Sequence, residues 1–256
     1  MEHEELWFTA ILNRLFAGPV TALLEALGVH VESPAHPIPD YFAMEILVVG
    51  IIMLMFLVIR RSLSVDRPGK LQHIMELLVE GLGGQAEEIV GHGAKAFVPL
   101  LFTLAVFIFL CNVLGIIPTF ESPTGVYLPG TSFPMVGIYV TLGLALVALC
   151  YYHYWGIHHH GVFGYLRTFM GPVLFIAPIM LPIELVSHLA RGLSLSVRLF
   201  ANMMAGHLVT MVFITLVPVV VPVIFEGLHI FVAALQSFIF VLLTMVYLGG
   251  AVSEEH

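Results

Sequence analysis

The sequence predicts an all-α membrane protein with about five transmembrane helices and an amphipathic surface helix, in which the last two helices are long, steeply tilted and packed as a hairpin. Of the 256 residues, 59% are hydrophobic and only 10% are charged, and the mean hydropathy is +1.02. The chain therefore has too little charge to cover a soluble globule. Its apolar residues also form runs long enough to cross a hydrocarbon core of about 30 Å. We treat residues 1–256 as a single polytopic membrane domain.

The N-terminal third of the chain predicts an interfacial segment, one span and a surface helix. Residues 1–40 begin with MEHEELWFTA, which is acidic where a signal peptide needs a basic start, so we expect this segment to be retained. Residues 6–28 mix apolar and polar groups, which favours an interfacial helix pair over a span. Residues 41–60 form span one. Residues 70–92 are amphipathic but too highly charged to insert, so they are expected to lie along the membrane surface.

The rest of the chain predicts four more spans. Residues 97–117 and 135–155 form spans two and three, and span three ends in aromatic side chains typical of a membrane interface. These aromatics are Tyr151, Tyr152, Tyr154 and Trp155. The last two elements are residues 173–217 and 223–252. At 1.5 Å per residue, residues 183–217 alone extend about 52 Å, more than a perpendicular crossing needs, so both elements are predicted to be steeply tilted.

The basic residues predict the topology. If the loop after span one is cytoplasmic, then of the seven Lys and Arg residues other than Arg191 and Arg198, only Arg14 is external. The cytoplasmic ones are Arg60, Arg61, Arg67, Lys70, Lys95 and Arg167. Cytoplasmic loops of membrane proteins carry an excess of basic residues. We therefore expect an external N-terminus and a cytoplasmic C-terminus.

The cysteines and histidines predict neither a metal site nor a cofactor. Cys111 and Cys150 lie in apolar runs, where a thiol behaves as a small hydrophobic group. His153 and His158–His160 lie at the end of span three and in a predicted Gly-rich loop after it. Consecutive histidines in such a loop point in different directions, and no acid or cysteine is spaced to complete a ligand set.

Residues 183–217 carry charge inside a segment that is otherwise apolar enough for lipid. An arginine at the centre of a membrane helix costs about 2.5–3.5 kcal/mol on insertion scales, so such charge predicts a functional site. At about 100° per residue, one set of side chains falls within an arc of about 80°. The set is Glu184, His188, Arg191, Leu195, Arg198 and Asn202. His207 points the opposite way, which favours two separate aqueous contacts over one binding pocket.

Two groups of titratable residues are predicted, one toward each membrane face. The external group is His207, Glu226 and His229, and the cytoplasmic group is Glu184, Ser187 and His188. Gln236 shares the face of His229 and points back toward the level of Arg198. Arginine does not titrate under physiological conditions, so Arg198 is a fixed positive charge between the two groups. Protons pass from one group to the other only if a mobile carboxylate from another protein visits both.

Two stretches resemble subunit a of the F-type ATP synthase: SLSVRLFANMMAGHLV (194–209) and LQSFIFVLLTMVYLGGAVSEEH (235–256). The resemblance covers about residues 40–256. It implies that Arg198 is the essential coupling arginine facing a rotor ring. The other matching positions are Asn202 and Gln236 beside the arginine, Glu184, Ser187, Arg191 and Ser194 on the cytoplasmic half-channel, and Asn112 as a channel asparagine.

The chain departs from the family pattern in the external group. The family pairs an acid with a histidine at the positions of His207 and His229, whereas both positions are histidine here. Glu226, one helical turn from His229, is the candidate for the missing acid. Other assignments have structural alternatives, because Asn112, Ser194 and Gln236 can also act as interhelical hydrogen-bonding residues worth about 0.6 kcal/mol each. A structural ion pair between Arg198 and Glu184 is excluded, since 14 residues separate them by about 21 Å along one helix.

The resemblance implies a proton-conducting stator subunit that is not catalytic alone and that couples proton flow to ring rotation and ATP synthesis. It implies the c-ring, the peripheral-stalk subunit b and the lipid bilayer of a bacterial inner membrane as partners, and no nucleic acid. A proton-coupled secondary transporter is the alternative, but it would show inverted repeats with broken helices in both halves. An intramembrane metalloenzyme would need a motif such as HExxH, which the sequence lacks.

Overall fold

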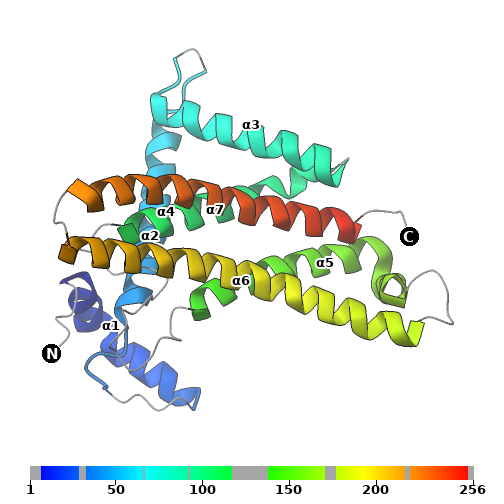
Figure 1. The fold of residues 1–256 in the computed structure, drawn as a ribbon, viewed down its shortest axis with the longest axis horizontal. Coiled ribbons are helices and arrows are strands. Elements are labelled where there is room, and N and C mark those ends of the chain that lie inside the picture. The colour runs from blue at the N-terminus through cyan, green and yellow to red at the C-terminus, as the bar shows by residue number, and fades with distance from the viewer. Residues whose placement is uncertain are drawn as a thin grey trace.

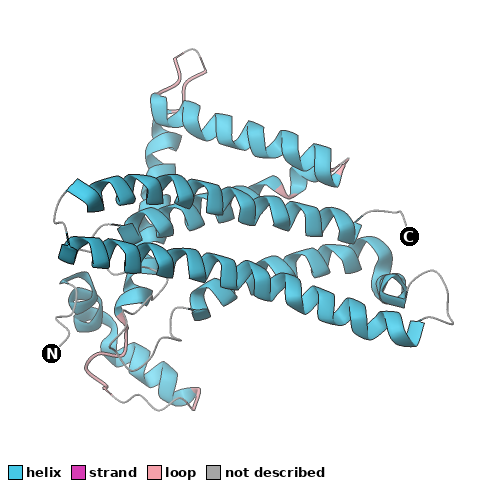
Figure 2. Cartoon of the chain, viewed as in Figure 1, coloured by secondary structure: helices cyan, strands magenta, loops and turns pink. Residues whose placement is uncertain are grey.

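The computed structural model describes residues 7–28, 33–65, 67–91, 93–116, 138–170, 177–216 and 220–252. All regular structure in these ranges is helical, which confirms the predicted fold class (Figure 2). The helices are α1 (Trp7–Ala26), α2 (Asp40–Ser62), α3 (Lys70–Val90), the short 3₁₀ helix η1 (Ala94–Ala96), α4 (Val98–Ile116), α5 (Ile138–Met170), α6 (Ala177–Leu216) and α7 (Val220–Val252).

Five helices in the described ranges are long and apolar enough to cross a membrane. The segments are Trp7–Ala26, Asp40–Ser62, Val98–Gly115, Ile138–Arg167 and Val221–Val252. α1 is in this set, so its length and composition also suit a span, and its interfacial position stays a prediction. Among the described residues, no segment of α6 belongs to these five. With 40 residues, α6 is about 60 Å long. This length exceeds a perpendicular crossing, which is the reason for its predicted steep tilt.

The four helices α4 to α7 form the body of the molecule, and α3 lies along the outer side of α7 (Figure 1). α6 packs most extensively against α5, and α7 against α4. The predicted hairpin of α6 and α7 is present as a further contact, in which the rings of Phe213 and Phe225 stack with centroids 4.5 Å apart. Each of these two long helices therefore has a different principal neighbour behind it.

The core lies where α4 and α7 meet. α4 is apolar around most of its circumference, as expected for a helix buried on several sides. On α7, Val241, Met245 and Leu248 are fully buried at helical spacing, so one face of the second half of this helix lies in the core. This burial gives α7 a fixed position from which its first half extends toward α6.

The backbones of α3 and α7 approach each other closely at Gly249. A Cβ at this position would lie 2.9 Å from the carbonyl oxygen of Ile89, so a residue with any side chain would push the two helices apart. The adjacent Gly250 has open space at the equivalent point. α3 itself forms the amphipathic helix predicted over residues 70–92, and its location on the membrane surface stays a prediction.

The predicted helix pair at residues 6–28 is wrong, because the segment forms the single helix α1. Pro19 lies inside this helix without ending it. The buried side chain of Asn13 holds α1 to the chain before α2, since its Nδ2 donates to the carbonyl of Ile38 (3.1 Å) and its Oδ1 accepts from the Ile38 amide (3.0 Å). Two hydrogen bonds to one backbone residue fix the angle between the two segments.

The predicted loop after span three is also wrong, because α5 continues to Met170. It is divided by a kink at Gly161, whose φ of 70° suits glycine. His158–His160 therefore lie in the turn before the kink, where the His158 ring stacks on Tyr154 with an interplanar angle of 5°. Tyr152, predicted as an interfacial aromatic, is instead 2% exposed and belongs to the core.

Candidate functional site

The centre of α6 presents Arg198 on an exposed face while its opposite face is buried. The buried face consists of Leu195, Ser196, Leu199 and Met203. Ser196 also shares a hydrogen bond of 3.1 Å with Thr141 of α5, a polar link inside an apolar seam. Arg198 is exposed and forms no ion pair with any carboxylate in the described part of the chain. Its charge is thus directed away from the bundle.

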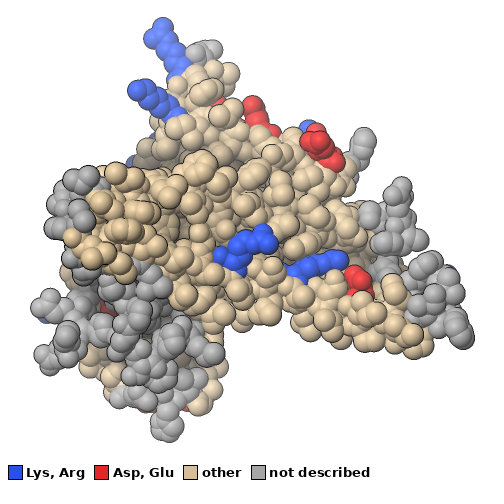
Figure 3. Space-filling view, viewed as in Figure 1, with Lys and Arg blue, Asp and Glu red and all other residues tan. Residues whose placement is uncertain are grey.

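The surface around α6 is largely uncharged. Figure 3 shows basic side chains in the middle of a broad face of neutral residues over this helix. The basic residues of α6 are Arg191 and Arg198. The stripe predicted from the sequence runs along the edge between the buried and exposed faces: Leu195 is buried, Arg198 is exposed, and Glu184, His188, Arg191 and Asn202 are half-buried.

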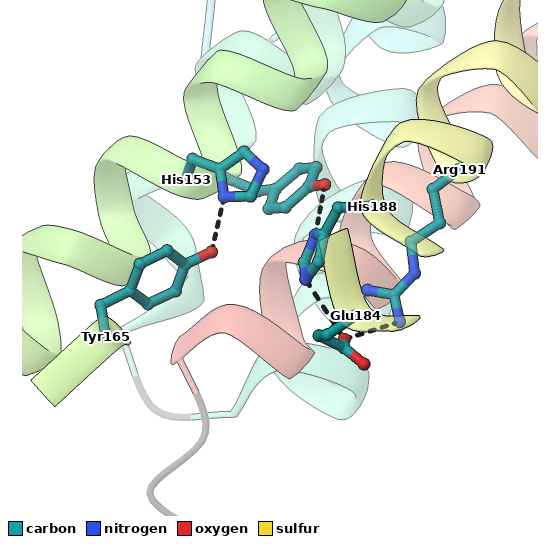
Figure 4. A network of polar contacts seen from close by, with 6 residues as sticks. His153, Tyr165, Glu184, His188 and Arg191 are labelled. Carbon is teal, nitrogen blue, oxygen red and sulfur yellow. Dashed lines mark hydrogen bonds and ion pairs between the residues drawn. The ribbon is translucent and has the colours of Figure 1, made fainter. Parts of the chain in front are cut away.

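Glu184 is the centre of a polar network near the start of α6 (Figure 4). Its Oε1 lies 3.3 Å from Nε2 of His188 and 3.7 Å from Nη2 of Arg191. The guanidinium of Arg191 also lies over the ring of Tyr247 on α7, with Cζ 5.4 Å from the ring centroid. Arg198 does not contact Glu184 in this network, in agreement with the prediction that the two residues are too far apart to form an ion pair.

α5 adds two hydrogen-bonded pairs to the same network. The hydroxyl of Tyr152 lies 2.8 Å from Nδ1 of His188, and the hydroxyl of Tyr165 lies 2.6 Å from Nδ1 of His153. The rings of His153 and His188 face each other with centroids 4.9 Å apart (Figure 4). Four titratable side chains from two helices are thereby brought into contact.

A groove of about 200 Å³ lies between α6 and α7 at the other end of the site. It is lined by Asn202, Ala205, Gly206, Val209, Phe225, Leu228, His229 and Val232. The His229 ring hydrogen-bonds the backbone of Asn202 and lies so close to Gly206 that a Cβ there would overlap it. The side-chain Nδ2 of Asn202 is buried and has no hydrogen-bond partner among the described residues. The groove therefore brings the titratable ring of His229 together with the side-chain amide of Asn202, which can still donate a hydrogen bond.

The remaining predicted site residues have varied surroundings. Asn112 is buried and its Nδ2 donates to the Ile108 carbonyl of its own helix (2.7 Å), so this bond is not interhelical. Gln236 is buried on α7, Ser194 is exposed, and Ser187 and Glu226 are half-buried. Glu226 does not line the groove around His229. His207 belongs to α6, but its side chain lies outside the described residues.

The sequence interpretation missed the contribution of α5 to this site. Tyr152 was assigned to the membrane interface, and Tyr165 was assigned no role. The packing face of α5 becomes visible only in the structure, where its buried residues recur at steps of four and three. This stripe is Thr141, Ala145, Ala148 and Tyr152. It identifies the face of α5 that packs against other helices, whereas the contact between Tyr165 and His153 depends on the kink at Gly161.

Comparison with known proteins identifies the family. The ATP synthase A chain family model matches residues 42–249. ATP synthase subunit a of Koribacter versatilis is 47% identical over 256 residues, covering both chains completely. The Solibacter usitatus subunit a is 46% identical over 246 residues, 96% of this chain and 100% of the relative. The Helicobacter hepaticus subunit a is 42% identical over 192 residues, 74% of this chain and 80% of the relative. The chain therefore belongs to the ATP synthase subunit a family.

Proposed function

We propose that this chain is the proton-conducting stator subunit of an ATP synthase membrane sector and serves the carboxylates of a rotating c-ring through two offset half-channels. The supporting observation is the position of Arg198, an exposed cation at the centre of a long helix whose other face is buried. A fixed charge directed out of the bundle and unpaired among the described residues suits a partner carboxylate supplied by another protein.

The two polar regions of α6 have the separation that two half-channels need. Glu184 and Gly206 are 22 residues apart, about 33 Å along the helix, and Arg198 lies between them. Because α6 is steeply tilted in this proposal, much of this distance lies in the membrane plane, which offsets the two half-channels laterally. The first region, with Ser187, His188, Arg191 and Ser194, forms the cytoplasmic half-channel. The second, with His207, Glu226 and His229, forms the external one, while Asn112 and Gln236 complete the polar lining.

Arg198 separates the two half-channels by charge. A ring carboxylate that has lost its proton meets a counter-charge at this point, which offsets the cost of an anion in low dielectric. The same positive charge repels a proton moving directly between the half-channels. Each elementary charge crossing 100 mV gains about 2.3 kcal/mol, and a direct leak would release this energy without rotation.

Co-purification tests the proposal at the level of the complex. We expect the intact membrane sector to contain this chain together with a ring of small carboxylate-bearing subunits and peripheral-stalk subunit b. Liposomes holding the whole sector should conduct protons, whereas liposomes holding this chain alone should not. Ring-independent, substrate-coupled proton flux by the chain alone would instead support a secondary transporter.

The proposed orientation in a bacterial inner membrane has its own test. In a background with Cys111 and Cys150 replaced by alanine, single cysteines are introduced at Arg61, Pro123 and Glu254. The last two positions lie outside the described residues. A membrane-impermeant thiol reagent is expected to label residue 123 from outside and residues 61 and 254 from the cytoplasmic side, because the basic residues cluster there. Labelling of residue 254 from outside would exclude a cytoplasmic C-terminus.

A further inference from the structure

Tyr152 of α5 lies at one end of a chain of polar contacts that leads through His188 to Glu184. Its side chain is 2% exposed, and its hydroxyl lies 2.8 Å from Nδ1 of His188. The opposite nitrogen of the same ring, Nε2, lies 3.3 Å from Oε1 of Glu184. One imidazole thus connects a hydroxyl on α5 with a carboxylate on α6.

The donors and acceptors in this chain of contacts fix its direction. A carboxylate oxygen accepts hydrogen bonds, so Nε2 of His188 carries the hydrogen that is shared with Glu184. In a neutral imidazole the other nitrogen is then an acceptor, and the hydroxyl of Tyr152 must donate to it. Glu184 thus favours the tautomer in which His188 donates through Nε2, and Tyr152 stabilises it further by donating to Nδ1.

The ring of His188 is also clamped in place by its neighbours. Its ring centroid lies 4.9 Å from that of His153 and 4.9 Å from that of Phe169, both on α5. His153 is in turn held by the hydroxyl of Tyr165. Because these two adjacent rings and the two hydrogen-bonding partners restrict its rotation, His188 cannot readily exchange its two nitrogens by turning over.

The other groups that face this cluster come from all three surrounding helices. α5 supplies Tyr152, His153 and Tyr165, α6 supplies Glu184 and Arg191, and α7 supplies Tyr247. Arg191 contacts the same Oε1 of Glu184 that faces His188, so two donors converge on one carboxylate oxygen. Both contacts therefore go to Oε1, and one of them depends on the tautomer of His188.

We propose that Tyr152 is a positioning residue of the proton path, acting through the tautomer of His188 to hold the carboxylate of Glu184. This inference rests on the proposed function, because it assigns Glu184 to the cytoplasmic half-channel. Tyr152 does not itself contact the translocated proton. The path therefore depends on α5 as well as on the two long helices that carry the sequence motifs.

The test uses Tyr152→Phe in the intact membrane sector reconstituted in liposomes. This change removes one hydroxyl and keeps the ring that packs in the core. Loss of one hydrogen bond at a buried acceptor is expected to lower passive proton flux about tenfold at equal assembly. Tyr154→Phe is the matched control, since Tyr154 lies on the same helix, is 62% exposed and belongs to no part of the network. Unchanged flux in Tyr152→Phe would overturn the inference.

Epistasis shows whether Tyr152 acts through His188. In a His188→Leu background, Tyr152→Phe is expected to cause no further loss, because the tautomer it controls is gone. A further loss of similar size would mean an independent role and would overturn the inference. Glu184→Gln tests the proposed half-channel separately. Normal flux in Glu184→Gln contradicts the proposed path, whereas reduced flux in Glu184→Gln with normal flux in Tyr152→Phe contradicts the positioning role alone.

A spectroscopic measurement tests the tautomer of His188 directly, without a measurement of proton flux. Nitrogen-15 NMR of histidine-labelled sector, with the His188 signals identified by their loss in His188→Leu, reports which ring nitrogen carries the hydrogen. We expect the Nε2–H tautomer in the unaltered chain. In Tyr152→Phe we expect a smaller fraction of this tautomer, because Glu184 still accepts from Nε2 but nothing then donates to Nδ1. The Nδ1–H tautomer in the unaltered chain would overturn the inference.

Discussion

Arg198→Ala is expected to abolish both ATP-driven proton pumping and ATP synthesis while the chain still folds and assembles. The side chain is exposed and makes no ion pair with a described carboxylate, so its removal leaves no buried charge without a partner. The buried face of α6 remains intact. A ring carboxylate, however, would lose its counter-charge between the half-channels and would take up a proton instead. ATP-driven acidification of inverted vesicles and ATP synthesis under an imposed gradient measure the loss.

Two variants accompany this experiment. Arg198→Lys should restore little activity, because lysine has a compact ammonium in place of the planar guanidinium and can lose its proton when buried. Arg167→Ala removes an exposed arginine from α5 and should leave pumping unchanged. Passive proton flux through the sector without its catalytic head should persist or rise in Arg198→Ala, since the barrier is gone. Normal coupled pumping in Arg198→Ala would refute the role assigned to this residue.

Gly206→Ala is expected to produce the second-largest loss, through the single methyl group that it adds. A Cβ at this position overlaps the ring of His229. The side chain of His229 can rotate more cheaply than two helices can separate, so the ring should leave the Asn202 backbone while assembly is retained. Displacement of a reacting group by about 1 Å can reduce a rate about a hundredfold. We expect proton flux to fall by at least about tenfold, measured in the same liposomes.

The matched control is Gly227→Ala, on the adjoining part of α7, where a Cβ meets no atom within 4 Å. Alanine is about 1 kcal/mol more favourable than glycine within a helix, so neither variant weakens its helix. A loss in Gly206→Ala but not in Gly227→Ala therefore reports the position of the His229 ring. Equal flux in the two variants would show that His229 is not needed where the structure places it.

The long helices and the position of Arg198 could be predicted from the sequence because they depend on local patterns. Apolar runs fix the spans, and the helical period places Arg198 away from Leu199 and Met203. Charge inside an apolar segment is rare enough to mark a site by itself. The placement of His229 beside α6 also followed, since two long helices separated by only three residues in the sequence are expected to lie antiparallel.

The contribution of α5 could not be predicted, because it depends on tertiary packing that overrides local preference. Glycines and consecutive histidines after residue 155 indicated a loop, yet the segment is helical on both sides of Gly161. Gly156 has a packing role instead, since a Cβ there would overlap the ring of Tyr165. The contacts among Tyr152, His153 and His188 join residues far apart in sequence, which no periodic pattern specifies.

The close approach of α3 and α7 at Gly249 has a mechanical consequence for the proposed rotary machine. A ring turning past α6 exerts a sideways force on the hairpin, and a stator must resist that force without yielding. Side chains at a helix interface can change rotamer and absorb displacement, but at Gly249 the two backbones meet with no room for even a methyl group. Backbone atoms in direct contact are almost incompressible. If α6 faces such a ring, α3 would act as a rigid strut behind α7, and the force would pass to α3 rather than be lost as elastic deformation.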